Sequence, residues 1–242
     1  MLYRKSRYLH EDHPGYAEQL SFDESVEALG ILESTDYGPP PERLKQLLEL
    51  RRLSVDGIKL VRSTRIPGLD ELCGANFTYR SFIECGETQK QLGIKNLPLN
   101  PASYNALYDL ATKILDPLIE YFGSIRLTYG FCSAELGRHI NQRVAPKLDQ
   151  HAACETGRLG KLICDRSGAA CDLIVEDENM LEVAEWIIRN LPFDRLYFYG
   201  PGLPLHVSFS PTPAGAAFAM ATSSSRRRIP RTLTLRMAAK NP

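Results

Sequence analysis

The sequence predicts an α+β fold in which a small, mostly antiparallel sheet packs against helices. Two observations lead to this class. Long stretches with apolar residues at helical spacing come before most of the short, β-type runs. The last two of these runs are joined by Gly-Pro-Gly at residues 200–202, a connection typical of a β-hairpin. Antiparallel neighbours are therefore expected near the end of the main domain.

The expected helices are amphipathic. Residues 103–122 (SYNALYDLATKILDPLIEYF) predict a long helix that Pro117 bends or interrupts and that Gly123 ends. A short helix is expected over residues 134–140. Residues 179–190 (NMLEVAEWIIRN) predict a further helix, whose apolar side would face the core.

Four short strands are expected, and one of them contains a residue that does not suit an apolar strand. The strands span residues 125–129, 169–175, 195–199 and 205–209. The second reads AACDLIV, so Asp172 interrupts an otherwise apolar run. Because a buried carboxylate is costly unless it is paired or bound to a metal, this residue needs a partner.

The chain divides into three regions of different composition. Residues 1–74 are charged and read as an N-terminal extension with a predicted helix at 42–52 (ERLKQLLELRR). Residues 75–212 form the expected main domain. Residues 213–242 are rich in Ala, Ser and Arg, which indicates a basic tail. That tail is either a flexible, solvated end or the one segment that could contact nucleic acid or an anionic surface.

Composition gives no support for several classes of partner. Lys+Arg and Asp+Glu both total 29, so overall charge gives no reason to expect a nucleic-acid or membrane partner. No run approaches the roughly 18 apolar residues of a membrane span, and the N-terminus has no secretory core. We therefore expect a cytoplasmic protein, or one released by lysis. The six cysteines show no CxxC pair, which favours thiols over disulfides or a zinc ribbon.

Two histidines and an aspartate form a candidate metal site. His206 lies in the β-type run PLHVSF and Asp172 in AACDLIV, where one shared cation would satisfy both side chains. With His151 as a third ligand, the set would leave a fourth position for water, as in catalytic zinc sites. Two other interpretations stay open from these residues alone. A strand histidine is often a hydrogen-bonded core residue, and Asp172 can instead pair with Arg166 or Arg195.

Residues from Asn76 to about Pro211 also carry a resemblance to a known family. The matching segments are FTYRSFIEC (77–85), LGIKNLP (92–98), LDPL (115–118), FGSIRLT (122–128), GFCSAEL (130–136), QH (150–151), GAACD (168–172), FDRL (193–196) and LHVSF (205–209). Together they resemble the zinc D-Ala-D-Ala carboxypeptidase and endopeptidase family, of the type A C-terminal-domain kind found in phage lysins. This resemblance implies a hedgehog/DD-peptidase-like fold for residues 75–212.

The resemblance also implies a chemistry. His151, Asp172 and His206 would be the three ligands of a Zn²⁺ ion, which lowers the pKa of its bound water and polarises the scissile carbonyl. A nearby carboxylate would act as the general base. The substrates of the family are peptide stems of the bacterial cell wall. Asp149 would either orient His151 or cap a turn.

The chain departs from the family at the groups that handle the peptide. Residues 152–167 are inserted between the first two ligands, and the stretch before His206 contains no carboxylate. Tyr199 takes the expected position of the base, although a phenol with a pKa near ~10 is a poor base at neutral pH. Glu155, in the insert, is the other candidate for a catalytic group.

The arginine that the family offers to its substrate is also replaced, by Cys132. Arg138 or Arg143 is a candidate to bind substrate in its place.

Three functional interpretations follow. The first is a zinc-dependent hydrolase of a peptide or amide bond. The second is a divergent metalloenzyme acting on a non-peptide, anionic substrate, with basic residues around the pocket: Arg138, Arg143, Arg158, Lys161 and Arg166. The third is a non-catalytic binding module whose metal is structural, with Cys154 or Cys164 as a fourth ligand that closes the site.

Overall fold

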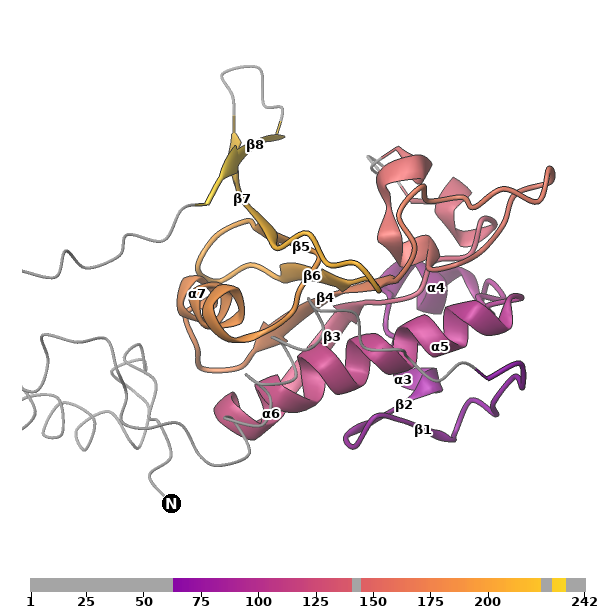
Figure 1. Cartoon of the computed structure of the whole chain (residues 1–242), viewed down its shortest axis with the longest axis horizontal. Coiled ribbons are helices and arrows are strands. Elements are labelled where there is room, and N and C mark those ends of the chain that lie inside the picture. The colour runs from indigo at the N-terminus through magenta and orange to yellow at the C-terminus, as the bar shows by residue number, and fades with distance from the viewer. Residues whose placement is uncertain (1–62, 141–144, 223–227, 234–242) are drawn as a thin grey trace, which may run out of the picture.

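The computed structural model describes residues 63–140, 145–222 and 228–233. The helix expected at 42–52 and the candidate Arg143 lie outside these described residues. The main sheet contains, in chain order, β3 (Ile125–Tyr129), β4 (Ala169–Val175), β5 (Arg195–Phe198), β6 (Leu205–Phe209), β7 (Ala216–Thr222) and β8 (Arg228–Thr232). Its spatial order is β3-β4-β6-β5-β7-β8 (Figure 1). Neighbouring strands are antiparallel except β5 and β7, which confirms the α+β class.

The helices and turns complete the described fold. The helices are α3 (Tyr79–Ile83), α4 (Glu87–Leu92), α5 (Pro101–Leu110), the π-helix η2 (Ala111–Leu115), α6 (Asp116–Phe122) and α7 (Met180–Asn190). Three 3₁₀ turns are η3 (Leu136–Arg138), η4 (Pro146–Leu148) and η5 (Gln150–Ala152). The helix expected at 134–140 is reduced to η3. The four predicted strands are confirmed, with β5 one residue shorter than expected.

The long predicted helix is present as the continuous run α5–η2–α6, and its irregularity has a physical cause. Pro117 lacks the N–H that would bond to the carbonyl four residues earlier, and its ring crowds that carbonyl. The chain widens into the π-turn η2 directly before this proline, which accommodates the ring without ending the helix. Gly123 then ends the run with φ 91°, a value that favours glycine.

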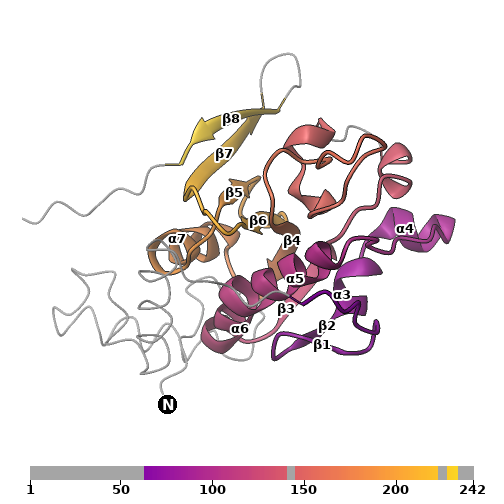
Figure 2. The ribbon, with the colours of Figure 1, turned by 45° about the vertical axis from the view of Figure 1, so that its right-hand side comes forward.

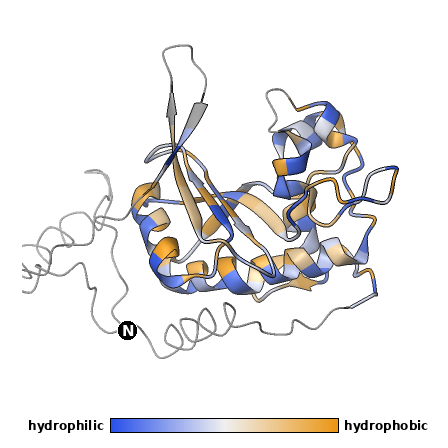
Figure 3. Ribbon diagram, turned by 45° about the horizontal axis from the view of Figure 1, so that its top comes forward, coloured by the Kyte–Doolittle hydropathy of each residue, from blue (hydrophilic) through white to orange (hydrophobic). Residues whose placement is uncertain are grey.

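Helices α5, α6 and α7 lie together against one face of the sheet (Figure 2). Figure 3 shows hydrophobic and hydrophilic stretches alternating along these helices, as expected for amphipathic helices. Alternate residues of β4 and β6, such as Leu173 and Val207, are buried in this helix-covered core. Since side chains alternate between the two faces of a strand, Asp172 and His206 point away from the helices.

The described fold extends past both expected boundaries of the main domain. Residue 74 lies between β1 (Leu72–Cys73) and β2 (Phe77–Thr78), which pair with each other, and Cys73 is fully buried in the core. At the other end, β7 and β8 extend the sheet beyond residue 212. Some residues assigned to a basic tail are therefore part of the sheet. No helix among the described residues is both long and apolar enough to cross a bilayer.

Candidate metal centre

Two of the predicted ligands are brought together by strand register. Asp172 of β4 and His206 of β6 are direct partners across the antiparallel ladder. His206 Nδ1 lies 2.8 Å from Asp172 Oδ1. A residue on each of two short strands is therefore sufficient to place an imidazole against a carboxylate on the face opposite the helices.

His151 reaches the same point from η5, in the long connection between β3 and β4. Its Nδ1 lies 2.7 Å from the carbonyl oxygen of Gly130. Because a carbonyl can only accept, Nδ1 carries a proton, and the lone pair of the neutral ring is on Nε2. That Nε2 lies 3.2 Å from His206 Nδ1 and 3.4 Å from Asp172 Oδ1.

Backbone contacts hold His151 in this position. The Gly130 carbonyl binds its ring, and the amide of Cys132 donates to the His151 carbonyl at 2.8 Å. Asp149 accepts a hydrogen bond from the His151 amide at 3.1 Å, so it caps η5. Of the two roles expected for Asp149, the capping role is the one observed.

Two glycines near the cluster let neighbouring backbone segments approach closely. A Cβ at Gly130 would lie 2.3 Å from the carbonyl oxygen of Phe82. At Gly168, just before β4, φ is +105° and a Cβ would lie 2.0 Å from the carbonyl oxygen of Phe209. Glycine is therefore required at both places, and these positions start the GFC and GAACD motifs of the sequence.

His151, Asp172 and His206 form a cluster that can hold a metal ion. One ligand atom from each residue lies within 4.8 Å of the other two, and no fourth His, Cys, Asp or Glu of the described residues joins them. Cys154 and Cys164 are outside this set, whereas the third interpretation required one of them as the fourth ligand of a closed site. A site with three protein ligands has the composition of an open, catalytic centre.

The charges in the cluster oppose the effect of burial. Burial disfavours the ionised form of Asp172, but the charge and hydrogen bond of His151, together with His206, hold the pKa of this carboxyl well below its usual range. Burial alone would lower the pKa of His151, but Asp172, Asp149 and the Gly130 carbonyl together outweigh burial and raise that pKa. The cluster therefore favours an ionised carboxylate beside a positive charge.

Glu155, the candidate base, is buried and engaged elsewhere. Its Oε1 accepts hydrogen bonds from the Asn100 amide at 3.0 Å and the Ser103 hydroxyl at 2.7 Å. The Leu99 amide donates to both carboxylate oxygens. Glu155 thus ties the insert to the residues just before α5 and to Ser103 in its first turn. Another acid, Glu176, directly follows β4; it is exposed, and its Oε1 lies 3.4 Å from Arg126 Nε.

Tyr199, the other candidate for a catalytic group, follows β5 directly and is half-buried.

The candidate substrate-binding arginines are scattered. Arg138 is exposed on η3, and Arg158 and Lys161 are exposed in the insert. Arg166, which the second interpretation placed at the pocket, binds Asp194 through Nε at 2.9 Å and through a second, shorter contact from Nη2. The alternative pairing of Asp172 with Arg166 is therefore not observed.

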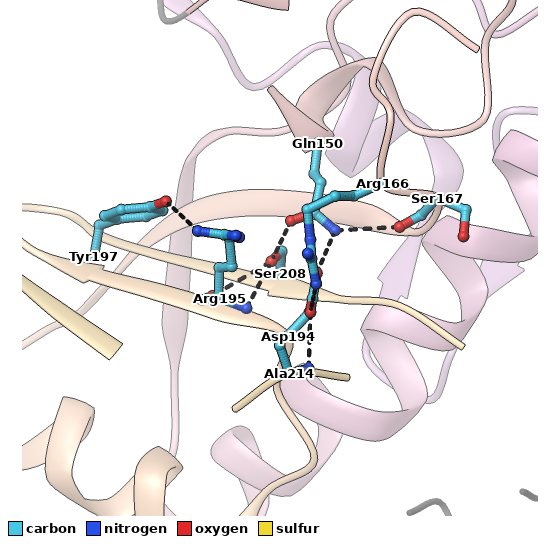
Figure 4. Close-up of polar contacts among 8 residues, drawn as sticks. All are labelled: Gln150, Arg166, Ser167, Asp194, Arg195, Tyr197, Ser208 and Ala214. Atoms are coloured by element: carbon cyan, nitrogen blue, oxygen red, sulfur yellow. Dashed lines mark hydrogen bonds and ion pairs between the residues drawn. The ribbon is translucent and has the colours of Figure 1, made fainter. Parts of the chain in front are cut away.

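A buried polar network beside the cluster was missed by the sequence reasoning. The Gln150 amide donates to Asp194 at 2.8 Å, and its carbonyl accepts from the Ser208 hydroxyl at 2.8 Å (Figure 4). Asp194 also accepts from the amide of Ala214. The network fixes η5, and hence His151, to the sheet. Two features of the sequence could have indicated this network: Gln150 directly precedes His151, and Asp194 lies in the FDRL segment.

All six cysteines are free thiols, as expected, and burial raises the pKa of the Cys164 and Cys171 thiols.

Comparison of the chain with protein-family models, with curated proteins and with solved structures finds no match. The assignment of a function consequently depends on the geometry and chemistry of this cluster.

Proposed function

We propose that the protein is a zinc-dependent hydrolase of a peptide or amide bond, with a fold of the D-Ala-D-Ala peptidase kind. The observation that carries this proposal is the convergence of His151 Nε2, His206 Nδ1 and Asp172 Oδ1 on one point. The three separations are 2.8, 3.2 and 3.4 Å. In a tetrahedron with zinc–ligand bonds of roughly 2 Å, the edges are about 3.3 Å. The donor atoms therefore need little movement to hold zinc.

Nitrogen and carboxylate oxygen are ligands that zinc accepts readily, and three of them leave one position open. Bound zinc would polarise the scissile carbonyl and make water a nucleophile at neutral pH. The protein's own contribution is to hold the ligands. The Gly130 carbonyl fixes the tautomer and direction of His151, a support typical of metal-binding histidines.

Aromatic rings enclose the proposed site on two sides. The Tyr129 ring lies 4.5 Å from the His151 ring, and the Tyr197 ring lies 5.3 Å from the His206 ring. These rings limit the access of bulk water to the histidines, which strengthens electrostatic interactions there. Continuing the alternation of β5 by one residue places Tyr199 on the same face, so we assign it as a hydrogen-bond donor to the substrate.

The first test is metal content. We expect about one zinc per chain in the wild type, as for a single three-ligand site, and almost none in His206→Ala. His139→Ala is the matched control, because His139 is exposed beside η3 and outside the cluster. Zinc that is equally abundant in all three proteins, or absent from the wild type, would overturn the proposal.

The second test is activity. The zinc-loaded wild type and His139→Ala should release free amine from a panel of peptides and N-acyl amino acids, and His206→Ala should not. If zinc is bound at the cluster but no amide in the panel is cleaved, the hydrolase is excluded and a metal-binding module remains.

A further inference from the structure

A single rung of side chains crosses the sheet through the proposed metal centre. In register from β3 to β7, the rung consists of Tyr129, Asp172, His206, Tyr197 and Phe218. The two ligands in its middle are therefore followed, on the β5 and β7 side, by two aromatic rings. Tyr197 is stacked on Phe218, with centroids 5.2 Å apart and an angle of 18° between the rings.

Arg195 stands beside this rung on the same face. It is two residues before Tyr197 in β5, and Figure 4 shows both side chains rising from the same side of the sheet. Its Nη1 donates to the Tyr197 hydroxyl at 3.3 Å, and its Cζ lies 5.9 Å from the centre of the Phe218 ring. The guanidinium is thus positioned by an aromatic pair that also contacts a metal ligand.

The charge of Arg195 is not neutralised within the described part of the chain. No carboxylate there forms an ion pair with it, and its Nε is buried without a hydrogen-bond partner. Arg166 differs, since it is paired with Asp194. A buried donor without a partner has lost its hydrogen bonds to water, so such a group in a native fold calls for an explanation.

The sum of charges on this face selects the sign of a ligand. Asp172 contributes one negative charge, a bound divalent ion two positive charges, and Arg195 one more. The face is then strongly positive once the metal is bound, and it would attract and orient an anion. A guanidinium beside a phenol hydroxyl offers several donors to one oxyanion.

We propose that Arg195 and Tyr197 bind an oxyanion of the same substrate whose reacting group meets the His151–Asp172–His206 centre. This inference rests on the proposed function and adds the substrate class: a molecule with a carboxylate or phosphoryl group. Tyr197 is the cross-strand partner of His206, and their rings lie 5.3 Å apart, so the oxyanion and the reacting group belong to one small substrate and are a few bonds apart. Arg195 is a specificity-determining residue in this proposal.

The test uses binding, not turnover, on the zinc-loaded full chain. The probes are ω-mercaptocarboxylates with two, three or four methylenes, and the neutral mercaptoalcohols of the same lengths. The thiol binds the metal in both series, so the difference in Kd isolates the carboxylate. We expect the best carboxylate to bind at least about tenfold tighter than its alcohol by calorimetry, as for a charge-assisted contact.

Variants assign that difference to the proposed residues. Arg195→Gln should abolish the tenfold preference, and Tyr197→Phe, which keeps the ring stack, should reduce it about threefold. Arg189→Gln is the control, because Arg189 lies on α7 and pairs with Glu185 at 3.6 Å. Arg195→Lys keeps the charge and should keep part of the preference if Arg195→Gln is poorly folded.

The outcomes separate the two proposals. Equal affinity for carboxylates and alcohols in the wild type, or a preference that survives in Arg195→Gln, overturns the oxyanion site and leaves the metal centre intact. Failure of the alcohols to bind the wild type means that the metal centre itself is wrong, and the oxyanion site falls with it. ω-Mercaptoalkylphosphonates, compared with the carboxylates, decide which oxyanion is preferred.

Discussion

Two carboxylates withdrawn from water meet adjacent residues of η5, yet they are neutralised differently. Asp194, fully buried, meets Gln150 and the permanent charge of Arg166. Asp172, with 27% of its side chain exposed, meets His151 and His206, and no Arg or Lys of the described residues pairs with it. The charge of the first carboxylate is neutralised by protein groups alone. The second is neutralised only when His151 gains a proton or the three groups share a cation.

The difference explains what each cluster is for. A buried charge is tolerated when it is paired and its hydrogen-bonding capacity is filled, which describes Asp194. Asp172 has two imidazole rings beside it in a fixed geometry, and the three groups together could hold a cation. A structural ion pair thus holds the turn that carries His151, and the neighbouring cluster has the composition to hold a cation.

The largest expected effect comes from breaking the Asp172 cluster. Asp172→Asn should lower zinc affinity by about a thousandfold, since roughly 10–16 kcal/mol of binding energy is shared among few ligands. Without zinc, the unfolding free energy of the variant should lie within about 1 kcal/mol of the wild-type value, because the lost attraction to His151 is offset by the lost cost of burying the carboxylate. The measurement is urea unfolding with and without zinc. Excess zinc should stabilise the wild type by about 3 kcal/mol and leave the variant unchanged.

Breaking the Asp194 cluster should have the opposite pattern. Asp194→Asn should lose about 2–3 kcal/mol of unfolding free energy without zinc, less than for a fully buried pair because Arg166 is 30% exposed. The folded variant should still bind zinc. Urea unfolding and metal analysis together check this prediction. If Asp194→Asn is as stable as the wild type, the network does not anchor η5.

The two clusters also show which parts of the fold and of the candidate site could be predicted from the sequence. Short strands with clear boundaries predicted β3, β4 and β6, and the misplaced Asp172 and His206 predicted two neighbouring residues on one face. That neighbourhood follows from local pattern, because a polar residue inside an apolar strand must face away from the core. His151 depended on the family resemblance, since nothing local distinguishes it from a histidine in a turn.

The remaining features depend on contacts between distant segments. Glu155 and Arg166 lie in the insert, and their partners are 28 to 56 residues away along the chain. A charged residue in a loop gives no signal of which backbone amides or carboxylate it will meet. β7 was missed for a related reason: its Ala-rich run resembles a flexible tail until β5 provides a parallel partner.

A third variant separates the structural role of Glu155 from the catalytic role expected of it. Glu155→Ala should cost about 2 kcal/mol of unfolding free energy, because the amides of Leu99 and Asn100 and the Ser103 hydroxyl lose a charged acceptor. Zinc content should stay unchanged. Glu155→Gln offers the sharper comparison, and an amidase rate that collapses in it while stability is kept would restore Glu155 as the base.

The smallest effect is a dependence of stability on pH that belongs to Asp194. Burial opposes its ionisation, but hydrogen bonds from Arg166, the Ala214 amide and Gln150 outweigh burial and lower the pKa of this carboxyl. A pKa lower in the folded than in the unfolded chain stabilises the fold above the unfolded value, near ~4, and this contribution is lost as pH falls further. The free-energy difference between the wild type and Asp194→Asn, by urea unfolding without zinc, should therefore shrink by about 1 kcal/mol from pH 5 to pH 3. Asp172 and His151 titrate in both proteins, so their contributions cancel in this difference. A gap that stays constant to pH 3 would mean that Asp194 is not held ionised by Arg166, and the distinction between the two carboxylates would disappear.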